Sequence, residues 1–255
     1  MTGKHIGAIW LDTTNPRSLL GEGQYSAIYL GKLNGSTNVA IKVIEVEDQP
    51  DEKYNQLPED QPDAYHNQMP GQMPAKQRSN RMNEVLGRLK HPNVIKLLGV
   101  EEEDSIKYFA LELCAATLDQ YCRGLYTGPM PREEDVLLQM ISGLRYVHSE
   151  KYVHRNIEPK NILISKFPIR IILSDFALSK PIDPNGSLSV SKNMSINQGR
   201  QLCWLAPEML DNPDDPGFSE KRGSIASDTF SAGCVIFYYL TLGLHPFGSD
   251  LHFLT

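Results

Sequence analysis

The strongest constraint on the fold is a pair of alternating apolar stretches near the start of the chain. Ile28 and Leu30 precede an Asn-Gly pair at 34–35, and the alternation resumes at 39–43. A period of two is the pattern of a half-buried strand, and Asn-Gly favours a tight hairpin turn. The sequence therefore predicts strands over residues 5–46, with neighbours paired antiparallel.

A tandem repeat interrupts this pattern. Residues 47–58 read EDQPDEKYNQLP and residues 59–70 read EDQPDAYHNQMP, with eight identities in twelve positions. A segment so rich in Pro, Gln, Asp and Asn cannot bury a core. We expect 47–76 to be a disordered surface insertion, which either docks a partner or reflects only duplication in a tolerant loop.

Helical periodicity replaces the alternation in the rest of the chain. Met82, Val85 and Leu89 share one face of a helix expected from about residue 78. A proline at position 92 ends this helix, because the residue before proline avoids helical torsions. The sequence further predicts strands at 94–100 and 108–113 and helices at 116–124, 133–150 and 226–243. Strands first and helices afterwards indicate an α+β chain.

Composition excludes several classes of protein. The chain has 255 residues, 40% hydrophobic and 22% charged, which is typical of a soluble globular protein. Its formal net charge of −6, without clusters of Lys or Arg, predicts no nucleic-acid partner. No apolar stretch approaches the roughly 20 residues of a membrane span. Four cysteines without a CxxC pair indicate reduced thiols in a cytoplasmic protein, not a zinc site.

A series of short motifs carries the chemistry. In chain order they are GEG at 21–23, VAIK at 39–42, HRN at 154–156 with Asn161 after it, DFA at 175–177, APE at 206–208 and DTFSAG at 228–233. Glycines let backbone N–H groups approach phosphates, and Lys42 follows at a distance from which it can reach them. Each motif alone is weak. Together, their order and spacing resemble the eukaryotic protein kinases over nearly the whole chain.

Three further segments resemble one branch of the kinases, the inositol-requiring kinase/endoribonuclease family of the unfolded-protein response. They are ELCAATL at 112–118, FSAGCV at 230–235 and HPFG at 245–248. The resemblance implies one kinase domain over 1–255 with a bilobal α+β fold. Its N-lobe (1–111) would hold an antiparallel sheet and one helix, followed by a hinge (112–114) and a mainly helical C-lobe (115–255). The chain stops 47 residues after the APE motif, so we expect an incomplete C-lobe and no endoribonuclease domain.

The resemblance also implies a site for ATP or ADP with Mg²⁺. Lys42 would contact the phosphates, and Asn161 and Asp175 would hold the metal, since Mg²⁺ prefers oxygen ligands. Leu111 would be the gatekeeper. The residues implied to line the nucleotide are Leu20, Gly21, Gly23, Ile28, Ala40, Lys42, Glu112, Cys114, Glu158, Asn161, Leu163 and Asp175.

The catalytic loop departs from the family pattern at Asn156. The family has an aspartate there, which accepts the proton of the substrate hydroxyl. The Asn156 side chain can orient a hydroxyl but cannot take its proton, and loss of a general base typically costs ~10²–10⁴ in rate. Asn156 is therefore the first reason to expect weak phosphotransfer.

Other members of the same network differ as well. Glu158 stands where the family has a lysine, and an acid about 4 Å from a phosphate charge is unfavourable by roughly 4 kcal/mol at an effective dielectric constant of about 20. Lys160 occupies the position of an arginine that tyrosine kinases use, and it could compensate. Gln201 replaces a threonine of the network. We interpret these changes as loss of phosphotransfer, against the alternative of independent drift or sequence errors.

The helix acid that should pair with Lys42 stays ambiguous. Glu84 is the nearest acid and matches a Glu-Val dipeptide of the branch, but the usual count back from His91 arrives at Met82. Glu84 also lies about 200° around the helix from Met82. It is either the partner of Lys42 or a solvated helix acid.

The activation segment expected over 175–208 has two further features. Ala177 replaces a glycine, at a cost on the order of 1 kcal/mol if the position requires positive φ. Four serines are possible phosphorylation sites, or belong to an ordinary Ser-rich loop; they are Ser187, Ser189, Ser191 and Ser195.

Three functions remain open on these grounds. The first is a nucleotide-binding, kinase-like module with weak or absent phosphotransfer, for which Asn156, Lys160 and Lys42 are the catalytic positions. The second is an active serine/threonine kinase that phosphorylates its own activation segment. The third is a non-enzymatic partner that pairs with a full-length relative. A homodimer or heterodimer through the kinase domain is expected, in the cytoplasm or at the cytosolic face of the endoplasmic reticulum.

Overall fold

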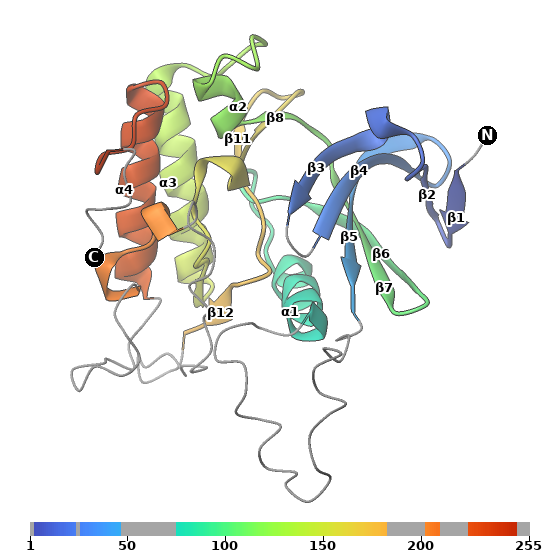
Figure 1. The fold of residues 1–255 in the computed structure, drawn as a ribbon. Coiled ribbons are helices and arrows are strands. Elements are labelled where there is room, and N and C mark those ends of the chain that lie inside the picture. Colours follow the sequence, from blue (N-terminus) through green and yellow to red (C-terminus); the bar gives the residue numbers. More distant parts are fainter. Residues whose placement is uncertain (1–2, 24–25, 47–74, 183–201, 210–223, 249–255) are drawn as a thin grey trace, which may run out of the picture.

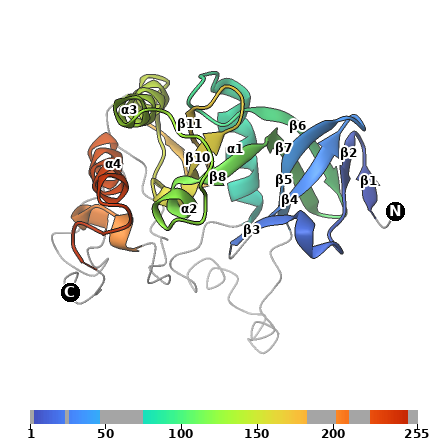
Figure 2. The ribbon, with the colours of Figure 1, turned by 90° about the horizontal axis from the view of Figure 1, so that it is seen from above.

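The computed structural model describes residues 3–23, 26–46, 75–182, 202–209 and 224–248. Strands gather in an N-terminal lobe and the longest helices in a C-terminal lobe beside it (Figure 1). The view from above in Figure 2 shows the same division. This arrangement confirms the expected α+β fold class.

An antiparallel seven-stranded sheet forms the N-terminal lobe. Its strands are β1 (Lys4–Ile6), β2 (Ile9–Leu11), β3 (Leu19–Gly23), β4 (Ser26–Leu33), β5 (Thr37–Glu45), β6 (Leu97–Glu103) and β7 (Ile106–Glu112). They lie in the order β1-β2-β4-β5-β7-β6, and β3 pairs with β4. The predicted turn joins β4 to β5 with φ of 50° at Asn34 and 73° at Gly35, torsions that these two residue types tolerate best.

Alternation along β5 sends its side chains into two different cores. Val39 and Ile41 join β1 and β2 in a cluster on the outer side of the sheet. Ala40 and Ile44 pack on the other side, in the main core that continues into the C-terminal lobe. Lys42 lies between them in the alternation, so its side chain leaves the sheet toward the main core.

Helix α1 (Ala75–Arg88) covers this inner side of the sheet and packs on β5 and β6. The helix begins three residues before the predicted start near residue 78. The insertion expected over 47–76 is therefore too long at its end, because Ala75 and Lys76 are already helical. The repeat itself, 47–70, lies outside the described residues.

The strand predicted to begin at residue 94 begins at Leu97 in the structure. Val94 forms a bridge to Leu173, and the Ile95 N–H donates to the Leu173 carbonyl over 2.8 Å. Val94 and Ile95 thus pair with β11 (Ile171–Leu173) of the C-terminal lobe and do not extend β6.

The helix predicted at 116–124 is observed from Leu118, but its first two residues belong to a strand. β8 (Cys114–Thr117) occupies that part and pairs with β10 (Ile162–Ser165), a tertiary interaction that sequence periodicity does not show. A short helix, α2 (Leu118–Cys122), follows. Thr117 caps it, since its hydroxyl accepts from the N–H of Gln120 while the Gln120 side chain accepts from the N–H of Thr117.

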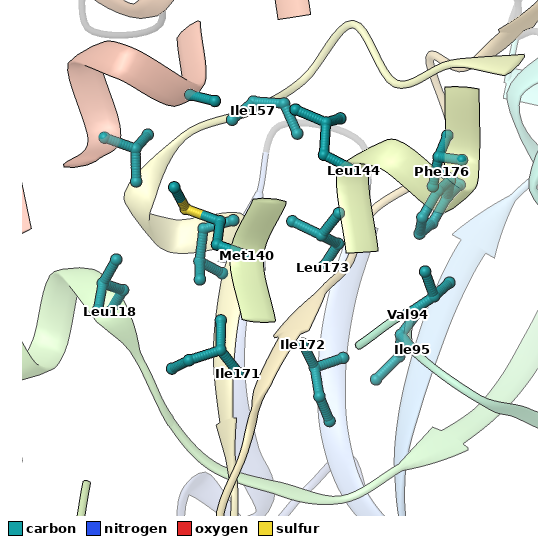
Figure 3. Close-up of a cluster of buried hydrophobic side chains, with 14 of the residues drawn as sticks. Val94, Ile95, Leu118, Met140, Leu144, Ile157, Ile171, Ile172, Leu173 and Phe176 are labelled. Atoms are coloured by element: carbon teal, nitrogen blue, oxygen red, sulfur yellow. The ribbon is translucent and has the colours of Figure 1, made fainter. Parts of the chain in front are cut away.

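The C-terminal lobe is built on two long helices, α3 (Glu133–Ser149) and α4 (Ile225–Leu240). Its remaining elements are β9 (Tyr152–Val153), η4 (Pro159–Asn161), β11 (Ile171–Leu173), β12 (Lys180–Pro181), η5 (Leu202–Trp204) and η6 (Pro207–Met209). Figure 3 shows how Met140 and Leu144 of α3 meet Ile171 and Leu173 of β11 in the main core. This packing fixes the loops at both ends of β10 and β11, where the predicted site lies.

Within the part of the chain that the structure describes, no helix combines the length and the apolarity that a bilayer crossing requires.

Candidate functional site

An ion pair between the two lobes lies at the centre of the predicted site. The ammonium of Lys42, on β5, is 2.6 Å from Oδ1 of Asp175, which follows β11. Lys42 is 6% exposed, and Asp175 adopts a left-handed torsion, with φ of 64°. Burial alone would raise the pKa of Asp175, but the Lys42 ammonium lowers it below its ordinary value, so Asp175 is a carboxylate.

Asp228, in the first turns of α4, holds the backbone of the catalytic loop. Its Oδ2 accepts from the N–H of His154 over 2.7 Å, and its Oδ1 accepts from the N–H of Arg155 over 2.8 Å. Oδ2 also lies 2.8 Å from Nε2 of His148. Three contacts to one buried carboxylate define the loop shape, including the positive φ of 66° at Arg155.

The buried ring of His154 joins this loop to the DFA segment. Its Nδ1 accepts from the N–H of Asn156 over 3.2 Å, and Nε2 lies 3.0 Å from the carbonyl of Ser174. The ring also meets Phe176 edge-on at 4.6 Å. Burial lowers the pKa of His154, which fits a neutral ring with Nε2 as the donor.

Asn156 therefore points at Asp175 from a fixed loop. Its Nδ2 donates to Oδ2 of Asp175 over 3.3 Å, so both carboxylate oxygens accept from the protein. The backbone carbonyl of Asn156 accepts from Nδ2 of Asn161 over 3.0 Å. The Asn161 Nδ2 also donates to Oε1 of Glu158 over 3.3 Å. The structure thus brings together residues from three separate parts of the sequence, namely Lys42, Asn156, Glu158, Asn161 and Asp175.

The donor types in this cluster fit Mg²⁺. Asn161 and Asp175 offer an amide and a carboxylate oxygen, and Mg²⁺ is commonly held by one or two carboxylates together with nucleotide phosphates. In the described residues no group of three His, Cys, Asp or Glu side chains converges on one point, so an all-protein metal cage is not formed there. Asp175 would have to share or exchange its present donors to bind an ion.

The positions implied for the phosphate loop lie in the β3–β4 hairpin. Gly21 pairs with Ile28, and Gly23 pairs with Ser26. A side chain added at Gly21 would meet no atom within 4 Å, so the space beside this backbone is open. Leu20, in the same strand, is 45% exposed.

The positions implied for the adenine lie where β5, β7, β8 and β10 meet. Ala40 is opposite Leu111 in the sheet, and Ala40, Cys114 and Leu163 are partly buried against the main core. Burial, helped by the nearby Glu112 charge, raises the pKa of Cys114 to about 12, so its thiol is protonated.

The Glu112 side chain has a structural role that the sequence did not reveal. It accepts from the backbone N–H of Lys96 over 2.9 Å and from the guanidinium of Arg170 over 2.6 Å. The end of β7 is thereby tied to the β10–β11 hairpin.

Glu84 is not the carboxylate that Lys42 contacts. It is 3.5 Å from the hydroxyl of Tyr152 and 4.0 Å from Arg81. The position reached by counting from His91 is Met82, which is 1% exposed in the main core. In this structure the counter-ion of Lys42 is Asp175.

The remaining residues singled out from the sequence are Lys160, Ala177, Gln201 and four serines. Lys160 is exposed on η4. Ala177 does not adopt a positive φ, so alanine in place of glycine causes no backbone strain at this position. Gln201 and the four candidate phosphorylation sites (Ser187, Ser189, Ser191 and Ser195) lie outside the described residues.

The two-lobed fold and this arrangement of motifs agree with a family comparison. The model of the protein kinase domain matches residues 15–252. The chain belongs to the protein kinase family. The kinase domain is 34% identical over 168 residues to the serine/threonine-protein kinase/endoribonuclease ire-1 of Caenorhabditis elegans, covering 64% of this chain and 16% of that protein.

Two other relatives give the same picture. The kinase domain is 41% identical over 173 residues to the human serine/threonine-protein kinase/endoribonuclease IRE2, covering 64% of this chain and 17% of that protein. It is 30% identical over 185 residues to ire1 of Schizosaccharomyces pombe, described as a sensor for unfolded proteins in the ER. That match covers 62% of this chain and 17% of that protein. The chain thus spans only 16% to 17% of the length of these relatives.

Proposed function

We propose that this kinase domain is a nucleotide-binding module in which phosphotransfer is weak or absent. The observation that carries the proposal is the contact of Asn156 Nδ2 with Asp175 over 3.3 Å, at the position where the family has its general base. An amide nitrogen can only donate, and the amide oxygen has no useful basicity, so the substrate hydroxyl keeps its proton.

Nucleotide binding is supported by the groups around Asn156. Lys42 offers a buried ammonium for phosphates, and the backbone near Glu112 and Cys114 offers hydrogen-bonding groups at the junction of the lobes. Ala40 and Leu163 supply apolar surface for a base. Mg²⁺ held by Asn161 and Asp175 would neutralise part of the phosphate charge when bound.

The names of the relatives extend the proposal to a biological setting. They are called kinase/endoribonucleases or a sensor for unfolded proteins in the ER. We infer that the kinase domain acts in the same type of signalling, at the cytosolic face of the endoplasmic reticulum or in the cytoplasm. Its partner there would be a second copy or a full-length relative, and nucleotide occupancy would favour the paired state. Sedimentation with and without ADP measures that state.

The function is tested by separating binding from chemistry. Thermal unfolding with and without ATP measures binding, with Lys42→Met as the variant that should lose the ATP-induced shift. Transfer of the γ-phosphate to a generic protein substrate measures chemistry, with Asn156→Asp beside the parent. We expect Asn156→Asp to be faster by about 10²-fold. Equal rates at a level typical of active kinases would show instead that Lys160 and the Asn156 oxygen suffice, and the chain is an active serine/threonine kinase. No ATP-induced shift would favour a non-enzymatic pairing role.

A further inference from the structure

We propose that Glu158 is a charged member of the divalent-cation site, beside Asn161 and Asp175, so that this chain holds a metal ion even without nucleotide. The inference rests on the proposed function and adds a residue to its Mg²⁺ site that the family pattern does not supply, since the family has a lysine at this position. Its physical basis is the placement of the Glu158 carboxylate and the charge that the carboxylate brings.

The Glu158 side chain lies beside one of the two residues assigned to the metal. Its Oε1 accepts from Nδ2 of Asn161 over 3.3 Å. The backbone fixes this neighbourhood, because Glu158 directly precedes η4, which ends at Asn161, and the N–H of Asn161 donates to the Glu158 carbonyl over 2.9 Å. Glu158 is 9% exposed, so protein rather than solvent surrounds most of its side chain.

The contact also determines which atom of Asn161 can meet a cation. The side-chain amide has two N–H groups, and its nitrogen has two acceptors, the backbone carbonyl of Asn156 and Oε1 of Glu158. The amide oxygen is then the atom that Asn161 offers to a metal, and oxygen is the ligand that Mg²⁺ prefers. Partners that orient metal ligands in this way typically change metal affinity by about 10–100-fold when they are mutated.

Asn161 in turn joins Glu158 to the segment that carries Asp175. The backbone N–H and the hydroxyl of Ser174, the residue before Asp175, both donate to the Asn161 carbonyl over 2.9 Å. Asn156 makes a second link, since its Nδ2 donates to Oδ2 of Asp175 over 3.3 Å. Two carboxylates and an amide oxygen therefore belong to one connected group, and Mg²⁺ is commonly held by one or two carboxylates.

The charge of this group favours a cation. Lys42 brings one positive charge, and Asp175 and Glu158 bring two negative charges, which leaves one net negative charge. With the aspartate and the lysine that the family has at 156 and 158, the same positions would be neutral. The added negative charge attracts a divalent cation, whereas it repels the phosphates of a nucleotide without metal. Glu158 thus favours a bound ion as the group that meets the phosphates.

The test is direct binding of Mn²⁺, which suits the same oxygen ligands as Mg²⁺, to the nucleotide-free 255-residue chain. Electron paramagnetic resonance measures the free ion. We expect saturable binding by the parent, weakened by about 10–100-fold in Glu158→Gln. The amide of that variant can still accept from Asn161, so the loss reports the charge. Glu150→Gln, at the exposed end of α3, is the matched control and should bind Mn²⁺ as the parent does.

A second variant, Glu158→Lys, introduces the residue of the family and should weaken Mn²⁺ binding at least as much as Glu158→Gln. It decides alone if circular dichroism shows that Glu158→Gln is unfolded. The inference is overturned if the parent shows no saturable Mn²⁺ binding, or if the folded position-158 variants bind the ion as tightly as the parent. Either result leaves the proposed function standing, because the ATP-induced shift in thermal unfolding decides nucleotide binding separately.

Discussion

The guanidinium of Arg170 donates to Oε2 of Glu112 over 2.6 Å, joining the β10–β11 hairpin to the end of β7. Both side chains are largely buried, at 23% and 17% exposed. Glu112 also accepts from the N–H of Lys96 at its other oxygen. One carboxylate thus joins three chain segments: the end of β7, the segment before β6 and the β10–β11 hairpin.

Neutralising this carboxylate should therefore destabilise the fold. Glu112→Gln keeps an acceptor for Lys96 but loses the charge opposite Arg170, and we expect a loss of about 1–2 kcal/mol in the free energy of unfolding. Urea denaturation measures it. Arg170→Met and the double variant complete the cycle, in which the two losses should not add. Additive losses would show that the ion pair contributes nothing.

Gly143 on α3 is required by close packing. A Cβ at this position would lie 2.6 Å from the carbonyl oxygen of Asn93 and 3.1 Å from Cδ1 of Leu173. Because a backbone atom cannot yield as a side chain can, we expect Gly143→Ala to lower stability by about 1–3 kcal/mol. Differential scanning calorimetry checks this. Gly233→Ala on α4 is the control, because a Cβ there meets nothing within 4 Å and alanine is the better helix former. The interpretation fails if both variants behave alike.

The capping box of α2 should contribute measurably to stability. Thr117→Ala removes the hydroxyl that accepts from the N–H of Gln120, and a cap of this kind is worth about 1 kcal/mol. Thr117→Ser keeps the hydroxyl and should recover most of the loss in chemical denaturation. A serine variant as unstable as the alanine variant would point to the β-branched packing of β8 instead.

Stability should also depend on pH through His154. Burial lowers the pKa of His154 below its ordinary value of 6.5, so the unfolded chain binds a proton that the folded protein does not. The stabilisation is complete above pH 6.5 and is lost as the pH falls from there toward the folded pKa. We expect a lower urea midpoint at about pH 5.5 than at about pH 7.5.

The control is His154→Asn, which should have a shallower pH dependence. Burial also lowers the pKa values of His91 and His245, which add to the slope with the same sign, so part of it should remain. An unchanged slope in His154→Asn would show that His154 is not responsible.

Sequence periodicity was a good guide to the long elements. The helix predicted at 133–150 is observed at Glu133–Ser149, because its apolar face repeats over many turns. The helix predicted at 226–243 ends at Leu240, since Leu242 and Gly243 both adopt positive φ. The helix predicted at 116–124 begins only at Leu118, because residues 116 and 117 belong to β8, which pairs with β10, a strand distant in sequence.

In the candidate site, too, local sequence motifs were predictable and contacts between distant residues were not. Motif spacing identified Lys42, Asn156 and Asp175, since each lies in a recognisable local sequence. It did not reveal that Lys42 and Asp175 pair directly, because the two residues are 133 positions apart and meet only in the folded chain. The role of Asp228 could have been suspected from the DTFSAG motif, but its three contacts come from α3 and from the catalytic loop, which lie far from it in sequence.

Asp228 holds the catalytic loop through the main-chain N–H groups of His154 and Arg155, and these two contacts do not involve the side chain at position 156. An aspartate at position 156 would therefore enter a loop whose backbone is already held in place by a residue of another element, α4.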